Sequence, residues 1–304
     1  MRIGGGVLEA IEKKIEQYVN ELGEEDISAI VSKIPAGKRL RAKLILEIAG
    51  SSEVAIKTAA IVEMIHAASL LHDDVIDEAD TRRGEPSINA KFGNKSAIMI
   101  GDVLYSKAFY ELIDLDKNVA KTISNAVIEL SIGERKDVYM ADSFNVDEKA
   151  YKHMIYQKTA ALIEAASEAA AIISNKDSNI YKTYGRNLGI AFQMIDDILD
   201  IISDSKTLGK PALNDFAEGK TTLPYIYLYN KLDSKDKEIL KSFHKKRLSE
   251  DEQKWILSKF KEHDIIKKAK DEAFELVNEA ISLMQKAGEQ GLEAIAVKMV
   301  DRSF

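Results

Sequence analysis

The stretch that decides the fold is residues 59–77, AAIVEMIHAASLLHDDVID. Its first thirteen residues are apolar on almost every side of a helix, and Asp73, Asp74 and Asp77 then form the pattern D-D-x-x-D. A helix that is apolar all round belongs in the middle of a bundle, covered by other helices. Residues four apart lie one above the other on a helix, so Asp73 and Asp77 share a face.

The same pattern occurs a second time, in residues 189–200, GIAFQMIDDILD, which carry Asp196, Asp197 and Asp200. Ionised carboxylates gathered in an apolar bundle repel one another and are costly to desolvate, unless they coordinate cations. Ligand sets made only of oxygen suit Mg²⁺, which shares its shell with waters and substrate phosphates. Two facing triplets therefore predict several Mg²⁺ ions that hold a phosphorylated ligand. The alternative is a pair of helix ends whose acids simply meet water.

The rest of the chain favours helices as well, because it has only four prolines and is rich in Ala, Leu, Ile, Glu and Lys. No series of alternating β-branched or aromatic runs joined by tight turns indicates strands. No linker of low complexity divides the chain, so residues 1–304 are expected to form a single domain. Helices are expected at residues 7–22, 26–34, 38–50, 54–80, 89–114, 117–141, 147–174, 177–203, 222–231, 235–245, 249–260 and 262–287.

Composition excludes several classes of protein. The 304 residues contain no cysteine, which removes disulfides, thiolate metal sites and thiol nucleophiles and favours a reducing compartment. A net charge of −7 argues against nucleic acid as a partner. The first residues lack the features of a signal peptide, and no window approaches eighteen uncharged apolar residues. A cytoplasmic protein without a transmembrane segment is the expectation.

Basic residues stand beside both aspartate triplets. Lys38 and Arg41 are three apart at the start of an expected helix, where free N–H groups add affinity for anions. Arg82 and Arg83 follow the first triplet, and arginine pairs phosphate oxygens bidentately. Further cations near the second triplet or before it are Lys158, Lys210 and Lys220. Any one of these clusters alone is most often a solvated face, but their placement beside both triplets indicates a diphosphate ligand.

His66 lies two helical turns before Asp73 on the same face, so it can point into the same cavity. A lone histidine at such a place is more often a hydrogen-bonded core residue than a ligand. Glu63 and His66 also form E-x-x-H, half of the motif of di-iron bundles. None of the other four histidines has Glu three residues before it, so the di-iron hypothesis is rejected.

Taken together, these residues resemble the trans-isoprenyl diphosphate synthases, or polyprenyl synthetases, and most closely their long-chain octaprenyl-type members. The resemblance implies an all-α bundle of the isoprenoid-synthase type around a deep central cavity, a homodimer and about three Mg²⁺ ions per active site. It also implies the reaction, in which isopentenyl diphosphate condenses head to tail with an allylic diphosphate and pyrophosphate is released. The motifs that carry the resemblance are Gly37-Lys38-Arg39, residues 66–77, Arg82-Arg83-Gly84, Gly101-Asp102, Lys158-Thr159, residues 193–197 and Gly219-Lys220.

Residue roles follow from the same resemblance. The implied metal ligands are Asp73, Asp77 and Asp196, with Asp74, Asp197 and Asp200 supporting them or binding through water. The isopentenyl diphosphate site would consist of Lys38, Arg41, His66 and Arg83, and the allylic diphosphate site of Arg82, Lys158, Lys210 and Lys220. Thr159 and Gln193 would lie near the developing allylic cation, with Gln193 on the face of Asp196. Two residues depart from the family pattern: Ala36 replaces the first Gly of Gly-Gly-Lys, and Ala42 replaces a Pro.

The length of the product depends on the helix before Asp73. In the family, an aromatic residue four or five positions before the first Asp closes the floor of the cavity. Those positions are Ser69 and Ala68 here, with Ile65 about one turn deeper, or ~5.4 Å. Small residues there predict a long-chain all-trans product of roughly thirty carbons or more, with about forty as the expectation. If Ala68 and Ser69 instead pack against Phe109, Tyr110 or Ile123, the product is geranylgeranyl or farnesyl diphosphate.

Other functions remain as alternatives. A terpene cyclase or a head-to-head condensing enzyme would not need the Lys38, Arg41 and His66 site for a second diphosphate. A silent subunit of a heteromeric synthase usually loses part of an aspartate motif, and both motifs are intact here. A helical scaffold with acidic ends does not explain the ordered set of motifs. As a synthase, the protein could hand its product to a membrane enzyme.

Overall fold

The computed structural model of the protein describes residues 5–202 and 213–300. Helices dominate both ranges, and the predicted all-α fold class is confirmed. In chain order, the elements are α1 (Gly5–Asn20), α2 (Glu25–Val31), α3 (Leu40–Ala49), α4 (Glu53–Ile76), β1 (Thr81–Arg82), β2 (Glu85–Pro86), α5 (Ile88–Phe92), α6 (Asn94–Leu112), α7 (Lys117–Met140), α8 (Glu148–Ile155), the π-helical turn η1 (Tyr156–Ala160), α9 (Ala161–Ile173), α10 (Ser178–Ile202), α12 (Asn214–Ala217), α13 (Leu223–Lys231), α14 (Ser234–Ser242), α15 (Glu250–Glu262), α16 (Ile265–Ala287) and α17 (Gln290–Val300).

Packing groups these elements into two compact units, each assembled from separate stretches of the chain. The first unit combines Met1–Ile128, Leu162–Gly185 and Ala287–Ile295, and the second combines Glu129–Ala161, Arg186–Lys286 and Ala296–Phe304. Helices α7, α10 and α17 each contribute residues to both units. The single-domain organisation stays a prediction.

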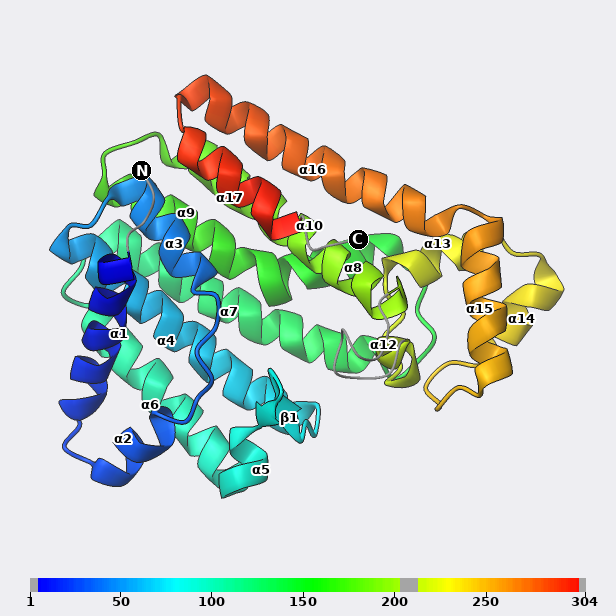
Figure 1. Cartoon of the computed structure of the whole chain (residues 1–304), viewed down its shortest axis with the longest axis horizontal. Helices are drawn as coiled ribbons and strands as arrows, with labels where there is room; N and C mark the ends of the chain where they lie inside the picture. Colours follow the sequence, from blue (N-terminus) through cyan, green and yellow to red (C-terminus); the bar gives the residue numbers. More distant parts are fainter. Residues whose placement is uncertain (1–4, 203–212, 301–304) are drawn as a thin grey trace. The chain divides into compact units, whose positions relative to one another are not determined.

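The first unit is built around α4, which packs against α1, α3 and α6. Figure 1 shows α4 and α6 running side by side in the blue and cyan part of the chain. By length and composition alone, α4 is the one helix of the described chain that could cross a membrane, but 61% of its apolar window is buried inside the protein. It therefore behaves as the core helix that its apolar sequence predicts.

Polar residues cap the helices that carry the site. Ser52 accepts a hydrogen bond from the Ala55 N–H at 3.2 Å and begins α4. Asp147 accepts one from the Ala150 N–H at 3.0 Å and begins α8. Both caps satisfy an N–H group that has no partner inside its helix.

Helix α4 ends four residues before the sequence-based expectation, because a hairpin follows it. Glu78 takes a left-handed backbone conformation (φ 50°), and β1 and β2 then pair with Thr81 opposite Pro86. The two turn residues, Arg83 and Gly84, both have positive φ (55° and 79°), as a tight two-residue hairpin turn requires. The expectation of a further turn of helix before Arg82 was therefore wrong.

Three other boundaries differ from expectation. Gly93 (φ 86°) divides the expected helix 89–114 into α5 and α6. Arg39 (φ 50°) is the N-cap of α3, so Lys38 lies before the helix and does not share a helical face with Arg41. Helices α12 and α17 were not expected from the sequence.

The expected helix 147–174 contains a π-helical turn at its centre, η1, which carries Lys158 and Thr159. Gly133 of α7 lies against this turn, and a Cβ atom there would come within 2.3 Å of the Lys158 backbone nitrogen. Side chains hold the same turn: Gln157 accepts from Lys136 Nζ and donates to Glu129 Oε2, both at 2.6 Å. Gly133 is thus required for the close approach of α7 to η1. π-Helical turns often occur at functional sites.

We expect Gly133→Ala to lower the free energy of unfolding by about 1–3 kcal/mol, because the added methyl group meets backbone that cannot move aside easily. Urea denaturation followed by circular dichroism measures the change. Gly6→Ala is the matched control, since a Cβ at Gly6 of α1 has open space and should leave stability unchanged or raise it slightly. Equal stability of the two variants would contradict the packing described here.

Candidate functional site

The first aspartate triplet lies at the C-terminal end of α4. The Asp77 N–H donates to the Asp73 carbonyl oxygen at 2.8 Å, so the two residues keep the one-turn spacing that the sequence predicts. Asp74 is only 3% exposed, and its Oδ1 accepts from Arg82 Nε at 2.6 Å and contacts Arg82 Nη2 at 2.5 Å. The middle aspartate of the triplet therefore anchors the arginine hairpin to α4.

Two residues that the sequence analysis missed hold the chain after this triplet. Asn89 Nδ2 donates to the carbonyl oxygens of Asp74 (3.2 Å) and Ala79 (3.0 Å). Ser87 Oγ donates to the Ala79 carbonyl oxygen at 2.7 Å. The Asp74 carbonyl also accepts from the Ala79 N–H at 2.9 Å, so these bonds join the end of α4 to the segment that follows the hairpin. In the sequence, only the presence of two polar residues, Ser87 and Asn89, shortly after Pro86 indicated this role.

Arg39 and Glu63 form a structural pair beside the basic cluster. Arg39 contacts Glu12 at 2.6 and 2.8 Å and Glu63 Oε2 at 3.1 Å. The buried Glu63 also accepts from the Ala42 N–H at 3.0 Å. A proline at position 42 could not donate this bond, so the departure from the family pattern has a structural reason.

Arg41, His66 and Arg83, three of the residues expected to bind isopentenyl diphosphate, lie close enough to influence one another's protonation. Burial, opposed by the charge of Glu63 and assisted by that of Arg83, lowers the pKa of Arg41 to about 10. Burial, followed by the charges of Arg41 and Arg83, lowers the pKa of His66 well below its usual value. His66 is therefore neutral at pH 7, and both arginines stay charged. Lys38 is exposed beside them.

The charges of this cluster are not balanced by acids. Arg83 Nη1 donates to the Pro35 carbonyl oxygen at 2.7 Å, and its guanidinium rests against Gly37, where a Cβ would come within 2.7 Å. Among the residues that the structure describes, neither Arg41 nor Arg83 pairs with a carboxylate, and the buried Arg41 Nε has no hydrogen-bond partner. Uncompensated cations around a neutral histidine favour an anionic ligand.

Gly101 and Asp102 of α6 accommodate His72, the residue before the first triplet. His72 Nε2 lies 3.1 Å from the Ile98 carbonyl oxygen and 3.4 Å from Asp102 Oδ1. A Cβ at Gly101 would come within 2.3 Å of the same ring nitrogen. This pair of residues thus fixes α6 against the end of α4.

Two of the three proposed chain-length residues, Ala68 and Ile65, are fully buried in the core of the first unit. Ser69 is partly buried, and its Oγ donates to the His66 carbonyl oxygen at 2.9 Å. Tyr110, one of the three bulky residues considered as a partner for Ala68, is 65% exposed and is not a core residue. The role of Ile65, Ala68 and Ser69 in product length stays a prediction.

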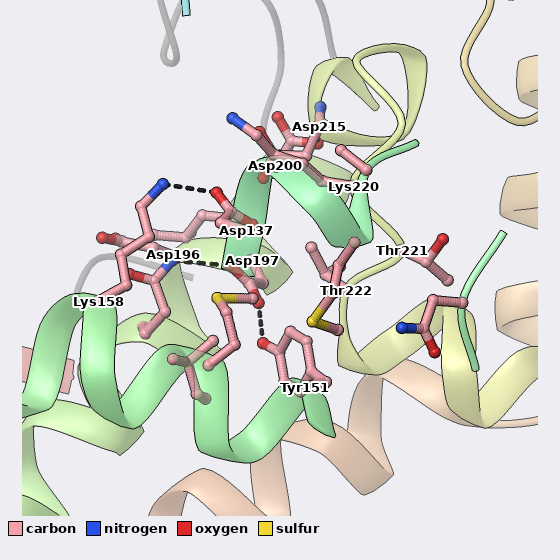
Figure 2. A pocket seen from close by; sticks show the side chains of 17 residues that line it. Asp137, Tyr151, Lys158, Asp196, Asp197, Asp200, Asp215, Lys220, Thr221 and Thr222 are labelled. Atoms are coloured by element: carbon pink, nitrogen blue, oxygen red, sulfur yellow. Dashed lines mark hydrogen bonds and ion pairs between the residues drawn. The ribbon is translucent and has the colours of Figure 1, made fainter. Parts of the chain in front are cut away.

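The second triplet lines a pocket of about 380 Å³ in the second unit (Figure 2). Five aspartates, two lysines and two threonines share its wall with apolar side chains such as Met154 and Leu199. Its polar lining residues include Asp137, Tyr151, Lys158, Gln193, Asp196, Asp197, Asp200, Asp215, Lys220, Thr221 and Thr222. The pocket brings together the three aspartates of the triplet, Gln193 and two of the lysines that the sequence singles out.

Asp197 is the centre of a hydrogen-bond network in this pocket. Tyr151 donates its hydroxyl to Asp197 Oδ2, and Gln193 Nε2 donates to Asp197 Oδ1 at 2.9 Å (Figure 2). Thr159 Oγ1 in turn donates to Gln193 Oε1 at 2.7 Å. Gln193 therefore hydrogen-bonds to Asp197, four residues later, in addition to lying on the same helical face as Asp196.

Electrostatics assign the protons of this network. Burial and the charge of Asp197 raise the pKa of Tyr151 well above its usual value, so the phenol keeps its proton. Burial, then Asp215 and Asp196, raise the pKa of Asp197, whereas the bonds from Tyr151 and Gln193 act in the opposite direction. Tyr151 was missed by the sequence analysis, because nothing local distinguishes it from a core tyrosine.

Asp200 closes one end of the pocket. It is 3% exposed, and its Oδ2 accepts from the Asp215 N–H at 3.2 Å. The hydroxyls of Thr221 and Thr222 are buried without a hydrogen-bond partner among the described residues, and Thr222 does not cap α13 although it occupies the N-cap. Buried polar groups without a partner are rare and usually meet water or a ligand.

The lysines of the expected allylic site have different surroundings. Lys158 Nζ contacts Asp137 Oδ2 at 2.5 Å and Glu134 Oε2 at 2.9 Å, two acids that the sequence analysis missed. In the sequence, only the three-residue spacing of Glu134 and Asp137 on α7 indicated that the two acids share a helical face. Lys220 lines the pocket and contacts Glu218 at 3.1 Å. Lys210 lies outside the described residues.

The aspartates fit Mg²⁺ rather than a metal enclosed by protein alone. Within residues 5–202 and 213–300, no group of three or more acidic or histidine side chains could hold a metal ion by itself. Mg²⁺ is usually bound by one or two carboxylates, with waters and substrate phosphates completing its octahedron. Two carboxylates one helical turn apart, Asp73 and Asp77, and the acidic pocket around Asp196 are donor sets of this kind.

Comparisons with known proteins agree with this chemistry. The sequence profile of the polyprenyl synthetase family matches residues 24–260. The short chain isoprenyl diphosphate synthase of Methanothermobacter thermautotrophicus is 36% identical over 246 residues, which is 76% of each chain. The octaprenyl diphosphate synthase of Haemophilus influenzae is 32% identical over 98% of both chains. The crystal structure of octaprenyl pyrophosphate synthase from Helicobacter pylori superimposes with a TM-score of 0.93 and 43% identity, covering 99% of this chain and 100% of that one. The chain therefore belongs to the polyprenyl synthetase family.

Proposed function

We propose that the protein is a Mg²⁺-dependent trans-polyprenyl diphosphate synthase that condenses isopentenyl diphosphate head to tail with an allylic diphosphate and releases pyrophosphate. The observation that carries the proposal is the pair of aspartate triplets, each with cationic side chains nearby, in a chain aligned over nearly its full length with octaprenyl diphosphate synthases.

Isopentenyl diphosphate is assigned to the basic cluster of the first unit. Arg41 and Arg83 lack acidic partners in the described chain and would neutralise the diphosphate, with Lys38 at the exposed rim. His66, neutral because of burial and the surrounding arginines, can donate a ring N–H without adding a further charge. Arginine suits this role because its planar fork pairs two phosphate oxygens at once.

The allylic diphosphate is assigned to Arg82, Lys158, Lys210 and Lys220 and to the aspartate triplets. Asp73, Asp77 and Asp196 are proposed as ligands of about three Mg²⁺ ions, with Asp200 binding through water. When bound, these ions stabilise the negative charge of the leaving diphosphate. Asp74 orients Arg82, and Asp197 orients Gln193, through the contacts described above.

No protein nucleophile is needed for this reaction, since the allylic diphosphate ionises and the new bond forms to the double bond of isopentenyl diphosphate. Thr159 and Gln193 are proposed to stabilise the allylic cation with their oxygen atoms. The apolar residues of the pocket wall, among them Met154 and Leu199, exclude water that would otherwise capture the cation.

We further propose a long-chain product of roughly thirty carbons or more, about forty as the expectation, because small side chains occupy positions 68 and 69 and relatives include octaprenyl synthases. A geranylgeranyl or farnesyl product remains the second candidate, favoured by the similarity to a short-chain synthase. We also propose that the enzyme is cytoplasmic, because the absence of cysteine favours a reducing compartment. Its product would then pass to a membrane enzyme.

A homodimer is proposed as the functional form. Large apolar side chains on and just after α6 are exposed, with Met99 at 60% and Ile113 at 77%. Exposed apolar residues of this size are typical of protein interfaces when they gather in a patch.

Incubation of the purified protein with isopentenyl and farnesyl diphosphates and Mg²⁺ tests the activity, with products sized by chromatography. We expect long prenyl diphosphates and stoichiometric pyrophosphate, and no product after EDTA treatment until Mg²⁺ is restored. Asp73→Asn and Asp196→Asn should each reduce the rate by at least about 100-fold, because several kcal/mol of charge stabilisation are lost.

Asp271→Asn, on the exposed surface of α16, is the matched control and should retain full activity. Cyclic products would indicate a terpene cyclase instead. An inactive protein that gains activity only with a second subunit would indicate a silent partner.

Ala68→Phe tests the assignment of product length. An aromatic ring on this face of α4 should shorten the product by several isoprene units, because one helical turn rises ~5.4 Å. Ala68 is fully buried, so Ser69→Phe serves as a second variant, and thermal unfolding confirms that each variant folds. Unchanged product length in both folded variants would show that this helix does not line the tunnel.

Light scattering coupled to gel filtration should give a mass twice that of one chain. Ile113→Lys should shift the protein towards the monomer, because a charge on an apolar interface is costly to bury. Lys121→Glu, at another exposed position, should leave the mass unchanged. A wild-type monomer at micromolar concentration would contradict the homodimer.

A further inference from the structure

We propose that Tyr151 is a positioning residue for the condensation, which acts through Asp197 to fix the side-chain amide of Gln193 and, with it, the hydroxyl of Thr159. The inference rests on the proposed function, since it concerns how the chain stabilises the allylic cation.

Four side chains form a continuous relay within the second unit. Tyr151 and Asp197 are buried, at 1% and 4% exposed, and Thr159 is buried as well. Tyr151, Gln193 and Asp197 all line the pocket, and the bond between Tyr151 and Asp197 is drawn in Figure 2. Gln193 joins Asp197 to Thr159 through bonds of 2.9 and 2.7 Å.

The direction of each hydrogen bond follows from donor chemistry. Tyr151 donates its hydroxyl to one oxygen of Asp197, and the Gln193 amide nitrogen donates to the other, so the carboxyl group is the acceptor in both bonds. The amide oxygen of Gln193 must then point the other way, where it accepts from Thr159 Oγ1. An amide side chain can otherwise adopt either of two orientations, and here the network selects one.

The direction of these hydrogen bonds leaves oxygen lone pairs that can stabilise a positive charge. Thr159 gives its only hydroxyl proton to Gln193, so the remaining capacity of both oxygens is to present lone pairs. Preorganised dipoles of this kind stabilise charge that develops in the transition state without reorganising at the moment of reaction. The π-helical turn η1 places Thr159 next to Lys158, which is assigned to the leaving diphosphate.

The Tyr151 hydroxyl is needed to keep the Gln193 amide in this one orientation. Without its hydroxyl, one oxygen of a buried carboxylate loses a donor, and Asp197 can turn to recover it from another group. The Gln193 amide then loses its fixed partner and can turn over. Outer residues that orient the groups of a metal site are typically worth a factor of about 10–100 in activity or affinity.

Tyr151→Phe, which removes only the hydroxyl, tests the inference. We expect kcat to fall about 10- to 100-fold while KM for both diphosphates stays within about twofold, since neither diphosphate is assigned to Tyr151. In a Gln193→Leu background the same substitution should have almost no further effect, because the residue through which Tyr151 acts is gone.

Another tyrosine of the chain provides a matched control. Tyr184 is fully buried and donates to the Leu292 carbonyl oxygen at 2.8 Å in the first unit, so Tyr184→Phe removes a buried hydrogen bond from a residue that does not line the pocket. This variant should keep the wild-type kcat, and a loss equal to that in Tyr151→Phe would show that the effect is one of general stability.

A binding measurement separates positioning from turnover. Isothermal titration calorimetry compares a diphosphate whose allylic carbon is replaced by an ammonium centre with a thiolodiphosphate of equal chain length whose prenyl group carries no charge, both with Mg²⁺. Tyr151→Phe should weaken binding of the ammonium analogue about tenfold or more and leave binding of the thiolodiphosphate unchanged. Should Tyr151→Phe fail to fold, Asp197→Asn breaks the same relay and should show the same selective loss.

The outcomes are distinguishable. A wild-type protein without condensing activity would overturn the proposed function. An active wild type with an unaffected Tyr151→Phe variant, additive effects with Gln193→Leu, or equal weakening of both analogues would overturn the role of Tyr151 alone.

Discussion

The structure depends on the requirement that a carboxylate buried in an apolar helix must be satisfied by its own protein. Leaving such a group unpaired costs about 3–5 kcal/mol. Asp74 meets the requirement through Arg82, and Asp197 meets it through Tyr151 and Gln193. Both are the middle aspartates of their triplets, turned about 100° from the first along the helix. Asp200, the third aspartate of the second triplet, is buried as well, and its Oδ2 accepts from the Asp215 N–H.

This division gives the two kinds of aspartate different tasks. Asp73 and Asp77, one turn apart at the end of α4, remain at the more exposed side, where an ion and its waters can be accommodated. Asp74 does not need to bind metal in order to matter, because it holds the arginine hairpin. Asp197 likewise connects the triplet of α10 to residues on α8 and η1. In the proposed function, the repeated pattern D-D-x-x-D combines metal ligands with residues that orient neighbouring groups.

The cations divide in the same way. Arg39 is held by Glu12 and Glu63, and Lys158 by Asp137 and Glu134. Arg41 and Arg83 form no ion pair with a carboxylate of the described chain, although Glu63 acts on both, and their mutual repulsion raises the free energy of the ligand-free site. A dianionic ligand relieves this repulsion, which favours binding at that place over other basic surfaces.

The sequence was sufficient for the helical class, for the position of α4 in the core and for the two triplets, because apolar periodicity and local spacing determine all three. It could not reveal the hairpin after Asp77, which depends on left-handed conformations at Glu78 and Arg83. The π-helical turn was equally hidden, since Tyr156–Ala160 has an ordinary helical composition. Tyr151, Asn89 and Asp137 were missed because their partners are distant in sequence, and a pattern within one helix contains no information about them.

The π-helical turn η1 has a consequence for how this protein can vary. Such a turn holds one residue more than a regular helix uses over the same rise, so the side chains of α8 and those of α9 do not follow a common period. Substitutions of pocket residues on α8 therefore do not require matching changes among the buried alanines of α9. The residues that line the pocket and those that pack in the core can vary independently, although they lie on one continuous helical segment.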